Sequence, residues 1–196
     1  MKKLTFNKVY TGVLIFGGII GLLAASILTW DKLKLAANPA YVPNCSLSPI
    51  VACSPVITSP QASAFGFPNT FLGLAGFAMV WTVGMMLLAE AKIRKKWFWW
   101  CFQLGTFFGV VFIGWLQHET LYEIGKLCIY CMITWLVTIP IFWTTLAYNL
   151  RERHIVVKDS IAKFFITNPG KIIAIHYLLI ILLIFFRFKD YWYSLI

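Results

Sequence analysis

The sequence predicts an all-α integral membrane protein: a bundle of four transmembrane helices plus a fifth transmembrane helix. Three observations predict this fold. Hydrophobic residues make up 60% of the 196 residues, charged residues make up only 12%, and five apolar stretches are each long enough to cross a bilayer. A hydrocarbon core about 30 Å thick needs roughly 20 apolar residues in a helix. Such a composition excludes a disordered chain and a soluble globular enzyme of ordinary composition.

The five predicted spans follow one another along the chain. They cover residues 10–30, 68–90, 97–116, 127–148 and 171–188. The first span follows a basic N-terminus, but its apolar run is longer than that of a signal peptide, so we interpret it as a retained helix. We divide the chain into a four-helix catalytic domain, residues 1–150, and a cytoplasmic linker with the fifth helix, residues 151–196.

The basic residues predict the orientation. Twelve of the 17 lysines and arginines lie before the first span, between the second and third, or between the fourth and fifth, counting Lys171 at the edge of the fifth span. The expected location is the cell membrane, either an inner or a plasma membrane. Because short cytoplasmic loops are rich in Lys and Arg, the N-terminus should lie in the cytoplasm and the C-terminus on the extracytoplasmic side. The excess of basic residues behind the net charge of +10 therefore lies mainly on the cytoplasmic face. The expected partner is the lipid bilayer and not a nucleic acid.

A long outer loop, residues 31–67, separates the first two spans and contains five of the eight prolines. A long connection without periodicity is usually functional or disordered. The apolar residues in this loop argue against disorder. We expect an irregular segment that lies on the membrane surface or caps the bundle.

Four of the five cysteines form two pairs on the predicted outer face. Cys45 and Cys53 lie in the long loop, and Cys128 and Cys131 begin the fourth span, which runs from outside to inside. Both pairs therefore lie on the side of the membrane where disulfides persist.

The Cys128–Cys131 pair has the pattern of an exchanging dithiol. Residues three apart share a helical face, and the positive N-terminal end of a helix, together with Lys126, favours a thiolate. Two structural disulfides or a zinc site are the alternatives. Seven residues between Cys45 and Cys53 are unusual for zinc, so we predict no metal.

The order of these motifs resembles the vitamin K epoxide reductase family. The resemblance covers roughly residues 10–150 and is carried by Cys45-Ser-Leu-Ser-Pro-Ile-Val-Ala-Cys53-Ser54, Ser59, Phe65-Gly66-Phe67-Pro68-Asn69, Gly73 and Cys128-Ile-Tyr-Cys131. It implies a four-helix bundle around a quinone at the outer side of the membrane.

The resemblance also implies a role for each cysteine. Cys131 would be nearest the quinone and pass electrons to it, while Cys128 would exchange with Cys53 in the loop. Cys45 would meet the thiol partner. Because each transfer needs a thiolate to attack a disulfide, the loop would have to move Cys53 to Cys128. Asn69 would donate a hydrogen bond to a quinone oxygen.

Three further residues are expected at the quinone. Phe65 and Trp135 would wall the pocket, and Ser59 is a weaker candidate. Trp135 stands where vertebrate members carry Tyr, and its indole N–H can donate but not accept a hydrogen bond. Many bacterial members continue after the fifth helix into a thioredoxin-like domain. Here the sequence stops at Ile196, so the resemblance implies a separate extracytoplasmic thioredoxin-like thiol oxidase as partner.

Two histidines near or within the spans have alternative interpretations. His118 and Glu119, near the outer end of the third span, could move protons to a reduced quinone, although we interpret them as a solvated turn. His176 lies within the fifth span, where an ionisable residue is a functional candidate. We expect it to hydrogen-bond another helix.

The sequence thus predicts a membrane thiol:quinone oxidoreductase that supports disulfide formation. The quinone could be of the menaquinone, ubiquinone or vitamin K type. Reduction of vitamin K epoxide is one alternative, and a non-catalytic membrane protein with structural disulfides is another. A second family of quinone-linked oxidases has two outer cysteine pairs as well, but there the Cys-x-x-Cys pair comes first in the chain.

Overall fold

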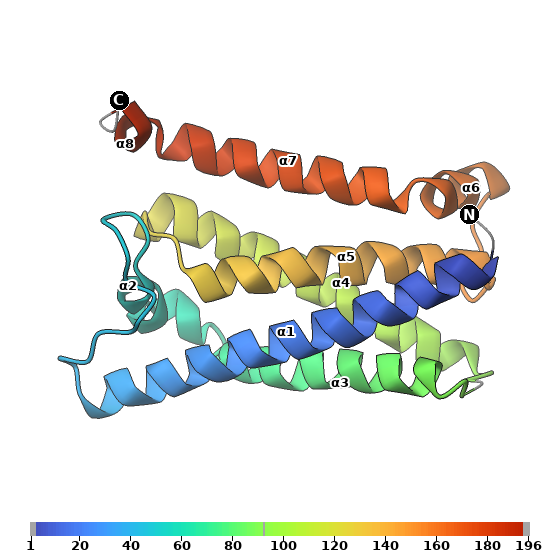
Figure 1. Ribbon diagram of the computed structural model, residues 1–196, viewed down its shortest axis with the longest axis horizontal. Coiled ribbons are helices and arrows are strands. Elements are labelled where there is room, and N and C mark those ends of the chain that lie inside the picture. The colour runs from blue at the N-terminus through green and yellow to red at the C-terminus, as the bar shows by residue number, and fades with distance from the viewer. Residues whose placement is uncertain (1–2, 92, 194–196) are drawn as a thin grey trace.

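The computed structural model describes residues 3–91 and 93–193, which fold almost entirely into helices (Figure 1). The long helices are α1 (Lys3–Ala37), α3 (Thr70–Leu88), α4 (Lys96–His118), α5 (Ile129–Arg151) and α7 (Pro169–Arg187). The short ones are α2 (Cys53–Thr58), the 3₁₀ turn η1 (Pro60–Ser63), the π-helix η2 (Glu119–Ile124), α6 (Asp159–Thr167) and α8 (Lys189–Tyr193). No β-strand occurs in the described ranges.

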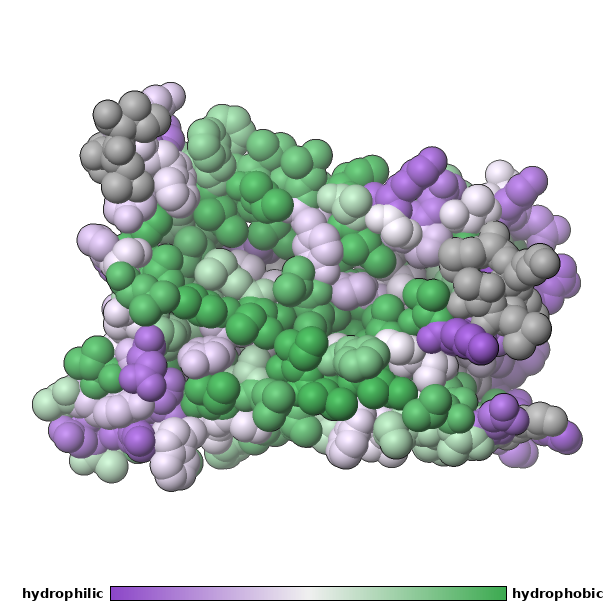
Figure 2. All heavy atoms as spheres, in the orientation of Figure 1, coloured by the Kyte–Doolittle hydropathy of each residue, from purple (hydrophilic) through white to green (hydrophobic). Residues whose placement is uncertain are grey.

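All five long helices are long and apolar enough to cross a membrane, which confirms the predicted all-α membrane fold. Helix α1 packs against α3 and α5, and α4 packs against α5. Figure 2 shows apolar side chains over the middle of the visible face and hydrophilic ones at its two ends. The chain is therefore a multi-pass membrane protein.

Helix α7 lies outside the four-helix bundle against α5 (Figure 1). None of its side chains is buried, as expected for a helix that faces lipid on most sides. Two polar contacts join it to α5: Trp143 Nε1 donates to His176 Nδ1 at 3.2 Å, and the Tyr177 hydroxyl donates to the Leu136 carbonyl. The contact with Trp143 confirms the expectation that His176 bonds another helix.

Helices α1 and α3 approach closely at glycine residues. A Cβ atom on Gly18 would lie 2.8 Å from the backbone of Trp81, and one on Gly84 would lie 3.0 Å from the backbone nitrogen of Ile15. Small residues allow transmembrane helices to pack with their backbones close together. These glycines fix the distance between the two helices.

The expectation of an irregular outer loop over residues 31–67 is wrong in part. Helix α1 continues to Ala37, two turns beyond the predicted end of its span, and α2 and η1 occupy residues 53–58 and 60–63. The extension is rich in Leu, Lys and Ala, which favour helices, and it stops before Pro39, which disfavours helical backbone at the residue preceding it. Polar residues end the apolar run here without ending the helix.

Both cysteine pairs lie at one end of the bundle. The loop after α1, the start of α5 and the C-terminal α8 gather at this end, and the start of α1 lies at the other (Figure 1). Of the basic residues that predict the orientation, Lys2 and Lys92 lie outside the described residues. We call the end with α2 and the start of α5 the cysteine end.

Candidate functional site

The loop cysteines form a disulfide inside a small apolar cluster. Cys45 and Cys53 are joined by an S–S bond of 2.02 Å, and both residues are buried. Leu28 and Leu35 of α1 pack against the pair, together with Val56 and Ile57 of α2. The extension of α1 beyond the predicted span therefore supplies part of the wall that holds the disulfide.

A short backbone bridge fixes the loop beside the start of α5. Val51 and Leu127 pair as an isolated parallel bridge, in which the Leu127 N–H donates to the Ile50 carbonyl at 2.7 Å and the Ala52 N–H donates to the Leu127 carbonyl at 2.9 Å. Lys126 Nζ donates to the Pro49 carbonyl at 2.6 Å. Cys53 and Cys128 each follow this bridge by one or two residues, so the bridge sets them side by side.

The sulfur of Cys128 lies 3.3 Å from that of Cys53. This contact already exists in the folded chain, so the loop need not move to bring the two sulfurs together. Cys128 is also the N-cap of α5, directly before the helix, whereas the predicted span begins at residue 127, and its sulfur accepts the Cys131 N–H at 3.5 Å. Cys128 and Cys131 are free thiols.

The pKa of Cys128 is lowered from that of an ordinary cysteine. The main cause is the hydrogen bond from the Cys131 side chain, and the Cys131 and Tyr130 backbone N–H groups lower the pKa further. Burial and the nearby Asp31 act in the opposite direction. The net result favours a thiolate at Cys128, beside the disulfide sulfur of Cys53.

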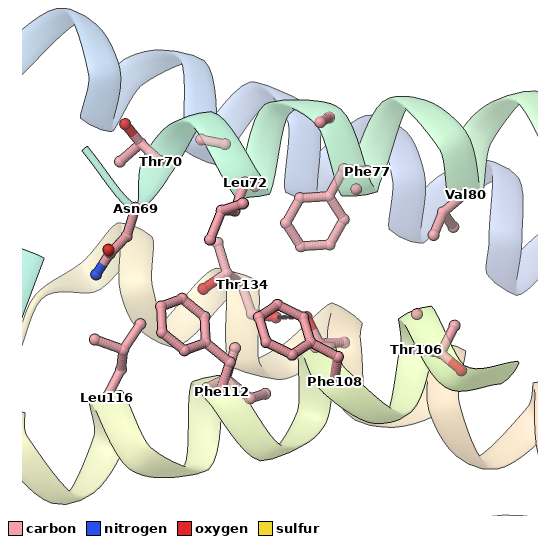
Figure 3. A pocket seen from close by; sticks show the side chains of 18 of the residues that line it. Asn69, Thr70, Leu72, Phe77, Val80, Thr106, Phe108, Phe112, Leu116 and Thr134 are labelled. Carbon is pink, nitrogen blue, oxygen red and sulfur yellow. Dashed lines mark hydrogen bonds between the residues drawn. The ribbon is translucent and has the colours of Figure 1, made fainter. Parts of the chain in front are cut away.

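A cavity of about 890 Å³ opens beside the same end of α5. Figure 3 shows its wall between α3 and α4, with Phe77, Phe108 and Phe112 projecting into it and Thr134 of α5 behind them. Cys131 lines this cavity, whereas Cys128 does not appear among its lining residues. The two cysteines of the pair therefore have different neighbours: Cys128 contacts the loop disulfide, and Cys131 borders the cavity.

A model of the vitamin K epoxide reductase family matches residues 12–146, more than half of the chain. The chain belongs to the vitamin K epoxide reductase family. No curated protein matches the sequence at a significant level. Family membership makes the chain a membrane redox protein, and the chain contains a Cys45–Cys53 disulfide.

Three of the four residues expected at the quinone line the cavity of this family member. These are Ser59, Asn69 and Trp135. Phe65 does not line it; its ring, which is 52% exposed, packs on Phe112 of the cavity wall with centroids 5.6 Å apart.

The Asn69 amide also organises a turn in the cavity wall. Its Nδ2 donates to the Gln61 carbonyl at 2.6 Å, and its Oδ1 accepts the Ala64 N–H at 3.1 Å. An amide nitrogen carries two hydrogens, so one N–H remains beyond the bond to Gln61. Lys32 of α1 holds the same turn by donating to the Ala62 carbonyl and to Ser63 Oγ.

Several polar residues of the cavity wall were not predicted as site residues. Thr134 and Thr138 line it together with Cys131 and Trp135. Their spacing of three, four and seven residues from Cys131 places them on one helical face, and this signal is present in the sequence. Gln61 and Glu119 have no such pattern, because they come from η1 and η2, two short turns that no periodicity marks.

Proposed function

We propose that the chain is a membrane thiol:quinone oxidoreductase that supports disulfide bond formation. The observation that carries the proposal is a continuous series of sulfurs: Cys45 is bonded to Cys53, Cys53 lies 3.3 Å from Cys128, and Cys131 borders a large apolar cavity. Electrons would enter at Cys45/Cys53 and leave from Cys131.

Each transfer is an ordinary thiol–disulfide exchange. A dithiol of the partner reduces the Cys45–Cys53 disulfide and is itself oxidised. The freed Cys53 thiolate then attacks Cys128 of a Cys128–Cys131 disulfide and releases Cys131, and Cys45 resolves the mixed disulfide. The loop pair is then oxidised and the Cys128/Cys131 pair is reduced. The structure has the same pattern, with a Cys45–Cys53 disulfide and free thiols at Cys128 and Cys131.

The cavity fits a quinone. Its wall is mainly apolar and aromatic, while the Asn69 amide and the Trp135 indole are donors able to bind carbonyl oxygens. When bound, a quinone supplies the oxidising power by accepting two electrons and two protons. Asn69 would orient it, Trp135 and Phe112 would exclude water, and Cys131 would present its sulfur to the ring.

The membrane orientation is part of the proposal. The cysteine end would face the extracytoplasmic side, where disulfides persist and a separate thioredoxin-like thiol oxidase could reach the loop. The excess of basic residues in the segments of the opposite end supports this orientation.

The variant Cys131→Ala tests the order of the sulfurs. Cys128 can still attack Cys53, which forms a Cys53–Cys128 disulfide and frees Cys45, but Cys131 is missing and cannot attack Cys128 to release Cys53. We expect this disulfide to accumulate and the reduction of menadione or ubiquinone-1 by dithiothreitol to fall at least about 100-fold. Non-reducing peptide mapping and quinone absorbance measure the two results.

Cys101→Ala is the matched control for the disulfide readout, because Cys101 is a free thiol of α4 outside the cluster that holds the Cys45–Cys53 disulfide, although it also lines the cavity. It should not trap a Cys53–Cys128 disulfide. A non-catalytic protein with structural disulfides would show no quinone reduction even in the unaltered chain. Vitamin K epoxide offered in place of the quinone tests the alternative substrate: turnover with the epoxide alone would replace the proposed acceptor.

A further inference from the structure

Glu119 is the only carboxyl group among the described residues that line the cavity. It begins the π-helix η2, directly after α4, and its side chain is only 16% exposed. This position differs from the solvated turn that the sequence suggests. π-Helical turns occur often at functional sites. A partly buried carboxyl group in a cavity with a mainly apolar wall is therefore a candidate for a functional role.

The contacts of Glu119 connect the cavity to water. Glu119 Oε2 accepts a hydrogen bond from Gln61 Nε2 at 3.2 Å, and Gln61 lines the cavity. Glu119 Oε1 lies 3.8 Å from His118 Nδ1, and the His118 side chain is 61% exposed. One carboxyl oxygen therefore faces a cavity residue, and the other lies beside an exposed imidazole.

The proton balance of the proposed reaction requires such a group. Oxidation of the Cys128/Cys131 dithiol releases two electrons and two protons, and conversion of a quinone to a hydroquinone consumes two of each. Where Cys128 is a thiolate, as its lowered pKa favours, one of those protons has already passed to water. One proton must then return from water to a quinone oxygen in a cavity with a mainly apolar wall.

We propose that Glu119 donates this proton to the quinone oxygen and is reprotonated from the aqueous cysteine end beside His118. The inference rests on the proposed function and assigns the proton donor of that reaction. Gln61 is a positioning residue, because it holds the carboxyl group at the cavity wall.

Other charged and titratable groups near Glu119 come from several elements. Lys32 of α1 lines the same cavity, but its Nζ is bonded to the Ala62 carbonyl and Ser63 Oγ. Arg187 of α7 donates to the Leu121 carbonyl of η2. The others are Cys131 on the cavity wall, Tyr122, whose ring lies tilted against that of His118, and the neighbouring Glu123 and Lys126. None of these is a carboxyl group in the cavity.

The variant Glu119→Gln tests the proposal because an amide can still accept the hydrogen bond from Gln61 but cannot act as an acid. With dithiothreitol as donor and menadione or ubiquinone-1 as acceptor, we expect quinone reduction to fall about 100-fold. Added acetate or formate should restore part of the rate, and Glu119→Asp should retain more activity than Glu119→Gln. The matched control is Glu123→Gln, which alters an exposed acid of the same turn and should leave the rate unchanged.

Two readouts separate proton donation from folding and from thiol exchange. Trapping of the Cys53–Cys128 disulfide in Glu119→Gln/Cys131→Ala should match that in Cys131→Ala alone, since it needs no quinone. Reduced-minus-oxidised infrared spectra should show a carboxyl band that shifts in ²H₂O and is missing in Glu119→Gln. An unchanged rate in Glu119→Gln, or no rescue by weak acids, would overturn the inference while the thiol:quinone activity stands. Absence of quinone reduction in the unaltered chain would instead remove the proposed function.

Discussion

The two sulfurs of the Cys-x-x-Cys pair differ because the chain changes conformation between them. Cys128 has extended backbone as the N-cap of α5, so its side chain reaches back toward Cys53, whereas Cys131 is in the first turn and borders the cavity. A pair wholly inside a helix would place both sulfurs on one face. The cap position thus lets Cys128 contact the loop disulfide while Cys131 borders the cavity.

The lowered pKa of Cys128 should appear in its rate of alkylation. In protein kept reduced by a phosphine, the thiolate of Cys128 should persist to lower pH than a free cysteine, whose pKa is about 8.5. Cys131→Ala removes the hydrogen bond that contributes most, so the midpoint should move to higher pH. Peptide-resolved alkylation with iodoacetamide across a pH series measures both midpoints. A midpoint that is equal in the two proteins would contradict this assignment.

At this scale the sequence singled out four cysteines that the fold brings to one end, and Ser59, Asn69 and Trp135, which line the cavity; the roles predicted for these residues stay predictions. Their order in the chain carried that information. The sequence could not place Glu119, because its burial depends on a π-helical turn that no hydrophobic period marks. The pattern also could not show that the loop holds Cys53 against Cys128 without a movement.

At the scale of elements, the approach of α1 to α3 is set by glycine, and Gly18→Ala should disturb it. The added Cβ would lie 2.8 Å from the Trp81 backbone, so the two helices must separate. We expect a loss of about 1–3 kcal/mol in stability, measured by thermal unfolding in detergent.

Gly12→Ala is the matched control in the same helix. A Cβ there meets no atom within 4 Å, so the helix propensity of Ala should leave stability unchanged or raise it by up to about 1 kcal/mol. Equal unfolding temperatures for the two variants would show that the α1–α3 distance is not set at Gly18.

The five spans were predictable because lipid requires long apolar helices, and apolar runs are visible in the sequence. The ends of the helices were less predictable. The apolar run ends near Trp30, but α1 continues to Ala37. Helix formation there depends on backbone propensity and on packing of Leu35 in the apolar cluster around the Cys45–Cys53 disulfide. Membrane burial and helix length are thus separate properties of the chain.

At the scale of the whole molecule, the proposed orientation predicts which loops are accessible from outside the cell. Leu47, at the cysteine end, and Val156, in the segment after α5, are 70% and 79% exposed. In a Cys101→Ala background, Leu47→Cys should react with a membrane-impermeant maleimide on intact cells, while Val156→Cys should react only after lysis. The reverse pattern would invert the orientation and place the disulfide on the cytoplasmic side.

The arrangement of the bundle was predictable in outline, since orientation alone placed both cysteine pairs on one side. The cavity was not, because it depends on how far α3 and α4 stand apart and on aromatic side chains such as Phe108 and Phe112 that line the gap. Apolar composition does not distinguish side chains that border a ligand from those that face lipid.

The burial of the Cys45–Cys53 disulfide limits which thiols can reduce it. Cys45 is only 3% exposed and Cys53 is fully buried, although the neighbouring Val42 and Leu47 are exposed. Attack on a disulfide requires a thiolate to reach one of its sulfurs. A small thiol such as dithiothreitol reaches these sulfurs only when the surface opens, so it must be supplied at high concentration, whereas a protein that binds Val42 and Leu47 could displace the segment over Cys45. Under the proposed function, steric access would then favour a protein donor, and small thiols at low concentration would reduce the quinone only slowly.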